Sequence, residues 1–324
     1  MGWKGVALVL GSAAAFATAG FWTRMVAADA WTILFWRGVF GSAFIGAVVW
    51  AREGRGAAAA FGQIGWAGLA VAACSTLGTV CFINALRRTS VADVMLINAT
   101  GPFVAAGLGM LVLRERERPA TLVAGVVALA GVAWMVGGAA VRGDLLGDAL
   151  ALAMVVVIAA MMVMIRAWRR IDMLPAAALS AFASAMVAAP WARPFDVGGM
   201  EFLWLALFGT TQFGLGLLLL TLGSRLVAPA RAALLGNAEV PLGPALVWAA
   251  FGEVPARETL MGGGLVMLAV VGEVMAGWYV NWGDSRGGVG WGVETKQERF
   301  GTENTERKGK ASHGGHGEAR EKKI

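Results

Sequence analysis

Residues 97–103 read Ile-Asn-Ala-Thr-Gly-Pro-Phe, and residues 236–242 read Gly-Asn-Ala-Glu-Val-Pro-Leu. Each stretch places an Asn four positions before a Pro, inside an apolar run long enough to cross a bilayer. A proline inside a helix lacks an amide donor and leaves the carbonyl four residues earlier without its helical partner. We therefore expect Asn98 and Asn237 to bring freed carbonyls as well as polar side chains, which lipid tolerates only where protein or a wet cavity satisfies them.

The composition is that of a membrane protein. Of the 324 residues, 58% are hydrophobic and only 15% are charged, and the mean hydropathy is +0.67. A water-facing surface needs more charge than this, so successive apolar runs of about 20 residues predict an all-α polytopic membrane protein. The basic residues are scattered through loops, so the net charge of +6 does not indicate a nucleic-acid partner.

Ten apolar spans joined by short loops can be read along the chain. They cover approximately residues 3–25, 30–51, 62–85, 91–113, 119–140, 145–165, 173–191, 202–222, 228–251 and 258–280. Beyond them the sequence becomes rich in Gly, Glu and Lys, which predicts a disordered cytoplasmic tail over 282–324. With the N-terminus inside, ten basic loop residues face the cytoplasm and six face outward. This excess predicts a multi-pass protein of the cytoplasmic (inner) membrane with both termini cytoplasmic.

The two halves of the chain repeat each other at nearly constant offsets. The matched pairs are Gly5 with Gly147, Arg24 with Arg166, Trp66 with Trp204, Gly78 with Gly216, Arg87 with Arg225, Asn98 with Asn237, and Pro102 with Pro241. Chance similarity between alanine-rich spans is the alternative explanation. Five spans in each half would place the second half upside down, and such inverted repeats are typical of transporters with a substrate site near the membrane midplane. We therefore predict two inverted five-helix repeats, at 1–140 and 141–281.

Several short motifs recur in this framework. They are Trp36-Arg37 in the second span, Asn84-Ala85-Leu86 closing the third, Pro102 in the fourth, Glu115 in Leu-Arg-Glu, Pro241 in the ninth, and Glu253 in Phe-Gly-Glu. With them, residues 3–280 resemble the EamA branch of the drug/metabolite transporter superfamily. The resemblance implies a secondary carrier of amino acids, nucleotide-type metabolites or toxic small molecules, and many such carriers are exporters. Ser180 stands where the second half would repeat Arg37, so symmetric binding groups are not expected.

Polar side chains within the spans are the candidate groups for substrate binding or coupling. They are Glu239, Asn237, Asn98, Gln212, Arg37 and Trp36. An ionisable residue near midplane, as Glu239 is, marks a functional site by default. Pro102 and Pro241 are the expected hinges.

Each of these groups also has a structural explanation. Glu239 could pair with a neighbour such as Arg231, although eight residues on one helix separate them by about 12 Å. Arg37 could extend to the membrane surface, and Trp36 could pack in the core. Glu273, inside the tenth span, is either a carboxylate that reaches the surface or a functional one.

We therefore expect a secondary active transporter, an exporter of small metabolites such as amino acids, that works by alternating access with protons as the candidate coupling ion. A channel or a non-transporting membrane scaffold is the alternative. The expected partners are a small-molecule substrate and the lipid bilayer, and a homodimer is a candidate assembly. The only histidines, His313 and His316, lie in the predicted tail, so no His-based metal or acid–base site is expected in the membrane. The sequence also shows no Gly-rich phosphate loop, Gly-x-Ser-x-Gly elbow or paired midplane carboxylates, so no enzyme, catalytic residue, metal site or cofactor is expected.

Overall fold

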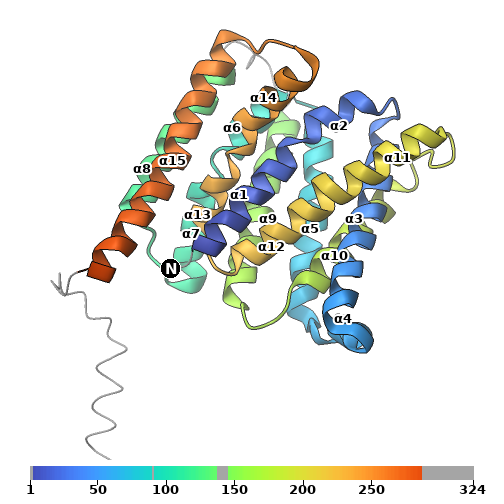
Figure 1. The fold of residues 1–324 in the computed structure, drawn as a ribbon, viewed down its shortest axis with the longest axis horizontal. Coiled ribbons are helices and arrows are strands. Elements are labelled where there is room, and N and C mark those ends of the chain that lie inside the picture. The colour runs from blue at the N-terminus through green and yellow to red at the C-terminus, as the bar shows by residue number, and fades with distance from the viewer. Residues whose placement is uncertain (1–2, 90, 137–144, 287–324) are drawn as a thin grey trace, which may run out of the picture. The chain divides into compact units, whose positions relative to one another are not determined.

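The computed structural model describes residues 3–89, 91–136 and 145–286, and these residues form helices joined by turns and loops (Figure 1). Internal contacts divide the chain into a unit of Met1–Trp278 and a second unit of Tyr279–Ile324. Everything described below lies within the first unit, apart from the last turns of the final helix.

The first part of the chain contains α1 (Trp3–Ala17), α2 (Ala19–Met25), α3 (Ala30–Glu53), the 3-10 turn η1 (Gly54–Gly56), α4 (Ala57–Gln63), α5 (Gly65–Leu86), α6 (Val91–Asn98), α7 (Gly101–Leu113) and α8 (Pro119–Val136). The second part contains α9 (Leu145–Ala167), α10 (Leu174–Ala188), α11 (Gly199–Leu207), the π-helical segment η2 (Phe208–Gly214), α12 (Leu215–Ser224), α13 (Pro229–Gly236), α14 (Glu239–Phe251) and α15 (Arg257–Arg286).

Eight helical stretches of the described residues are long and apolar enough to cross a bilayer, and two shorter apolar helices, Pro119–Met135 and Leu174–Ala188, complete the ten expected spans. The prediction of an all-α polytopic membrane protein is confirmed. The final helix α15 continues to Arg286, so residues 282–286 are helical. The rest of the predicted tail, 287–324, lies outside the described residues, as does the predicted boundary between the repeats at 140/141.

The same helix contacts are made twice, once from each half. α1 packs on α12, and α9 packs on α5. A Cβ added to Gly78 of α5 would lie 3.0 Å from Ile158 of α9, and one added to Gly216 of α12 would lie 2.7 Å from Phe16 of α1. These four residues occupy matched positions of the sequence repeat, so the packing follows the expected inversion.

Two helices end with a residue in the left-handed conformation. Arg114 closes α7 with a φ of 54°, and Gly252 closes α14 with a φ of 72°, both in the left-handed region. Glycine adopts this conformation readily, whereas a side chain such as that of Arg114 costs about 1 kcal/mol there. The residues that follow directly are Glu115 and Glu253, so both glutamates leave their helices from the same backbone geometry.

Candidate functional site

A cavity of about 1290 Å³ lies among helices of both halves. Its wall contains residues of α1, α3, α5, α7, α9, η2, α13 and α14. Away from its mouth, the charged and amide side chains of the wall are Arg37, Asn98, Gln212, Asn237 and Glu239. The structure therefore gathers five of the six predicted binding or coupling residues around one space.

The break between α13 and α14 places two of these groups in the wall. α13 ends at Gly236 and α14 begins at Glu239. Asn237 is only 4% exposed, and its side-chain nitrogen is buried without a hydrogen-bond partner. The Glu239 carboxylate lines the cavity and makes no hydrogen bond or ion pair with any described residue. As the first residue of α14, it lies at the positive end of that helix, which favours a carboxylate there.

The matching break lies between α6 and α7. Asn98 is the last residue of α6, and α7 begins at Gly101. Asn98 and Gly101 both line the cavity, so the two interrupted helices face the same space from the two halves of the chain.

The prediction that Asn237 has a free carbonyl is wrong. That carbonyl accepts a hydrogen bond of 3.1 Å from the backbone N–H of Val240. Pro241 is the third residue of α14, and Pro102 is the second residue of α7. Both prolines therefore occupy a first turn, where an N–H has no helical acceptor in any case. Neither proline lines the cavity, and each break precedes its proline instead of forming a kink around it.

Arg37 extends from α3 into the cavity wall. Its guanidinium carbon lies 4.5 Å from the centre of the Phe213 ring, and its Nε is buried without a hydrogen-bond partner. The backbone of Arg37 packs closely against Gly209 of η2. A Cβ added to Gly209 would lie 3.1 Å from the Arg37 carbonyl oxygen and 2.7 Å from Cβ of Phe40, so there is no room for a side chain between the two segments. No carboxylate of the described chain pairs with Arg37, so its charge has no counter-ion among the described residues.

Gln212 lies within η2, the π-helical segment that interrupts the eighth span. Such wider turns are rare and are often found at functional sites. Gln212 is 3% exposed, and its side-chain nitrogen donates to the carbonyl of Phe16 at 3.4 Å, while Oε1 has no partner. Gln212 Oε1 is therefore a buried acceptor without a partner among the described residues.

Trp36 lies outside the cavity wall. Its indole N–H donates to the carbonyl of Pro194 at 3.2 Å. Its ring packs against Phe40 and Phe202, with ring centres 5.4 and 4.9 Å away. This is the packing alternative that the sequence left open, so the substrate-binding assignment of Trp36 gains no support from the geometry.

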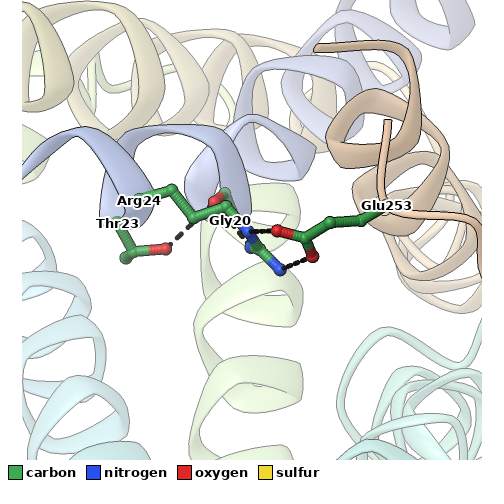
Figure 2. Close-up of polar contacts among 4 residues, drawn as sticks. All are labelled: Gly20, Thr23, Arg24 and Glu253. Carbon is green, nitrogen blue, oxygen red and sulfur yellow. Dashed lines mark hydrogen bonds and ion pairs between the residues drawn. The ribbon is translucent and has the colours of Figure 1, made fainter. Parts of the chain in front are cut away.

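An ion pair borders the mouth of the cavity. Figure 2 shows Arg24 of α2 with Nε 2.8 Å and Nη2 2.6 Å from the two carboxylate oxygens of Glu253, while Nη1 donates to the Gly20 carbonyl at 3.0 Å. The hydrogen bond from Arg24 lowers the pKa of the Glu253 carboxyl below its ordinary value. Nearby in the lining, the Arg87 guanidinium lies 5.4 Å from the centre of the Trp31 ring.

A second charged cluster lies at the opposite face, where the fourth, sixth and eighth spans end. Arg166 Nη2 is 3.4 Å from Glu115 Oε1, and its Nη1 donates to the backbone carbonyl of Arg225 at 3.1 Å. Arg225 in turn lies 3.5 Å from Asp172. None of these four residues lines the large cavity. The cavity therefore reaches the face that carries Arg24, and the face that carries Arg166 is closed.

Pro244 was not among the predicted site residues, yet it lies inside α14 and lines the cavity. Its missing N–H leaves the Val240 carbonyl, also in the wall, without its helical donor. The proline was visible in the sequence, but it has no counterpart in the first half, where Ala105 stands. Pro244 therefore carries no signal from the sequence repeat.

Arg231 does not pair with Glu239. Its Nε lies 2.8 Å from Glu273 Oε1, which joins α13 to α15. Glu273 is 2% exposed, so the surface-reaching alternative for this residue is wrong. Among the described residues, no group of three or more side chains is suited to hold a metal ion.

Comparisons with known proteins agree with this arrangement. The profile of the EamA-like transporter family matches residues 3–137. A solved structure described as "Crystal structure of protein" is similar with a TM-score of 0.75 and 17% identity, over 86% of this chain and 99% of that chain. At this identity the likeness shows the fold alone. No curated protein matches the chain.

Proposed function

We propose, from the match of residues 3–137 to the EamA-like transporter family, that this protein is a membrane transporter and a secondary carrier for a small zwitterionic metabolite of the amino-acid class. The observation that carries the proposal is a set of unpaired polar groups on one cavity wall. These are the Arg37 Nε, the Gln212 Oε1 and the Asn237 side-chain nitrogen, all buried without a hydrogen-bond partner. The Glu239 carboxylate lies in the same wall.

The two charges of the wall suit the two charges of such a substrate. Arg37 can receive a carboxylate, and Glu239 can receive an ammonium group. Gln212 supplies an acceptor and Asn237 a donor, both already desolvated. Because unsatisfied buried polar groups cost free energy, a ligand that pairs with them recovers that cost on binding.

The rest of the wall is apolar. Phe16, Phe208 and Phe213 contribute aromatic rings, and Met154 and Met162 contribute flexible thioethers. A volume of about 1290 Å³ exceeds that of a single amino acid, so the space also holds water. We therefore propose that the aliphatic or aromatic side chain of the substrate packs here, with loose selectivity for its shape.

The two halves, 1–140 and 141–281, would supply alternating access. The cavity reaches only the Arg24 face in the described residues, and the excess of basic residues on the opposite face makes that face cytoplasmic. The conformation is then open to the outside, with both termini in the cytoplasm. Rocking the halves about the fixed site would open the other face.

Glu239 would couple transport to protons. A single carboxylate accepts either a proton or the ammonium group of a substrate, and the two exclude each other. Export of substrate is then accompanied by entry of a proton on the emptied carboxylate, so that a proton gradient drives the cycle.

The test is transport by purified protein in proteoliposomes. Glu239→Gln keeps the shape and removes the titration, so we expect loss of uphill transport on a proton gradient, with saturable substrate binding at least partly retained. The matched control is Glu258→Gln, which changes an exposed glutamate of α15 outside the cavity. Uphill transport by Glu239→Gln at the parent's rate would show that Glu239 is not the coupling group.

Pro102 and Pro241, which follow the breaks before α7 and α14, remain the predicted hinges. Replacing Pro102 or Pro241 with Ala would permit each pair of half-helices to join into a continuous helix. We expect the transport rate to change more than the substrate affinity in both variants. Unchanged rates in both would remove the hinge assignment.

A further inference from the structure

The ion pair at the cavity mouth has a counterpart at the closed face. Arg24 and Arg166 are matched positions of the repeat, and so are Glu253 and Glu115. Each arginine lies in the last turn of its helix, α2 or α9. Each glutamate follows directly on a left-handed residue that ends α14 or α7. The same Arg–Glu ion pair is thus formed twice, and each pair joins one half of the chain to the other.

The two ion pairs differ in the carbonyl that accepts a hydrogen bond from Nη1 of the arginine. At the closed face, Arg166 Nη1 donates to the carbonyl of Arg225 at 3.1 Å, and α9 packs against α12. At the mouth, Arg24 Nη1 donates to Gly20 of its own α2 helix at 3.0 Å (Figure 2). The residue matched to Arg225 is Arg87, which lines the same mouth as Arg24.

The exposure of the two arginines follows this difference. The Arg166 side chain is 7% exposed, whereas that of Arg24 is 39% exposed. No contact comparable to that of α9 with α12 joins α1 to α5 in the described part of the chain. At the closed face, the arginine of the second repeat therefore donates to the C-terminal end of the helix that α9 packs against. The matching arginine of the first repeat, Arg24, makes no such contact at the open face.

We propose that Arg24 closes the mouth: its Nη1 leaves the Gly20 carbonyl and donates to the backbone carbonyl of Arg87, while Arg166 releases the carbonyl of Arg225 at the opposite face. This inference rests on the alternating-access function proposed above. The glutamates stay paired throughout. Burying an arginine without its counter-ion is expensive, so Glu253 and Glu115 accompany the arginines as each face closes.

The test compares repeat-matched substitutions in one assay. The full-length protein, with Cys74→Ala and Cys81→Ala, carries Thr259→Cys in the lining of the mouth. In nanodiscs, the rate of reaction with a sulfonate-bearing methanethiosulfonate reports how often the mouth is open. Arg24→Gln removes the donor that closes the mouth and should raise the rate. Arg166→Gln loosens the closed face and should lower it, each by about fivefold.

A merely structural role would not produce effects of opposite sign. Glu253→Gln should raise the labelling rate, as Arg24→Gln does, and Glu115→Gln should lower it, as Arg166→Gln does. These two variants provide a second comparison if an arginine variant fails to fold. The matched control is Arg52→Gln, because Arg52 pairs with Asp172 at 3.8 Å at the closed face and has no such matched partner.

Two outcomes separate this proposal from the proposed function. Labelling rates that are unchanged, or that move in the same direction in Arg24→Gln and Arg166→Gln, overturn the gate assignment even if Glu239→Gln abolishes proton-driven transport. Opposite shifts in labelling support the gate even if no amino-acid transport is detected.

Discussion

Arg231 Nε lies 2.8 Å from Glu273 Oε1, with the two side chains 12% and 1% exposed. The Nε–H is not aligned with the carboxylate, so the contact is a charge pair, and Arg231 Nη2 donates instead to the Glu273 backbone carbonyl at 3.3 Å. Glu273 Oε2 is buried without a hydrogen-bond partner. The pair therefore fastens α13 to α15 at the cost of incomplete hydrogen bonding.

Removing one member of this pair should destabilise the protein more than removing both. Arg231→Met leaves the Glu273 carboxylate buried without a counter-ion, and we expect a loss of about 3 kcal/mol. The double variant Arg231→Met/Glu273→Leu removes both charges and should recover most of that loss. Thermal unfolding in detergent measures both variants. Equal loss in the single and double variants would contradict the pairing.

Arg114 should be replaceable with a gain in stability. Its φ of 54° is a conformation that glycine adopts without strain, and its side chain is exposed. We expect Arg114→Gly to stabilise the protein by about 1 kcal/mol. Arg116→Gly, two residues further along the same loop, has no positive φ to relieve and should give no gain. Similar melting shifts in the two variants would contradict this reading.

The mouth pair should weaken in acid. The hydrogen bond from Arg24 lowers the pKa of Glu253, so the folded state binds fewer protons than the unfolded chain near that pKa. The stabilisation is therefore present above the unfolded value of about 4.3 and is lost as the pH falls through the lower folded value. The melting difference between the parent and Glu253→Gln should shrink below pH of about 4, and should also shrink in high salt because both side chains are exposed. A difference that is constant from neutral to acidic pH would contradict the assignment.

Gly209 should tolerate no side chain. A Cβ there would lie 2.7 Å from Cβ of Phe40 and would push η2 away from α3. We expect Gly209→Ala to cost about 1–3 kcal/mol and to weaken substrate binding, because Arg37 moves with α3. Gly46→Ala is the control, since a Cβ at that position of α3 would meet nothing within 4 Å and should stabilise the helix by about 0.5–1 kcal/mol. If Gly209→Ala leaves substrate binding unchanged, Arg37 does not contribute to the substrate site.

The sequence by itself determined the spans, the two interrupted helices and the repeat. Lipid leaves no alternative to a helix for a long apolar run, and a proline disfavours an uninterrupted helix because it removes a backbone donor. Asn98, Asn237 and Glu239 could be assigned to a cavity on similar grounds, because lipid does not satisfy polar groups at that depth. Their polarity inside apolar spans is a local property of the chain.

Only the tertiary structure decided which faces of the helices meet. Spans that are apolar all round carry no stripe to show which side faces protein and which faces lipid. Trp36 therefore could not be separated from Arg37 by sequence, although one packs outside the cavity and the other lines it. The pairs Arg231–Glu273 and Arg24–Glu253 span 42 and 229 residues of chain. Such pairs form because helix packing brings distant segments of the chain together. A local pattern of residues in the sequence does not predict which segments meet.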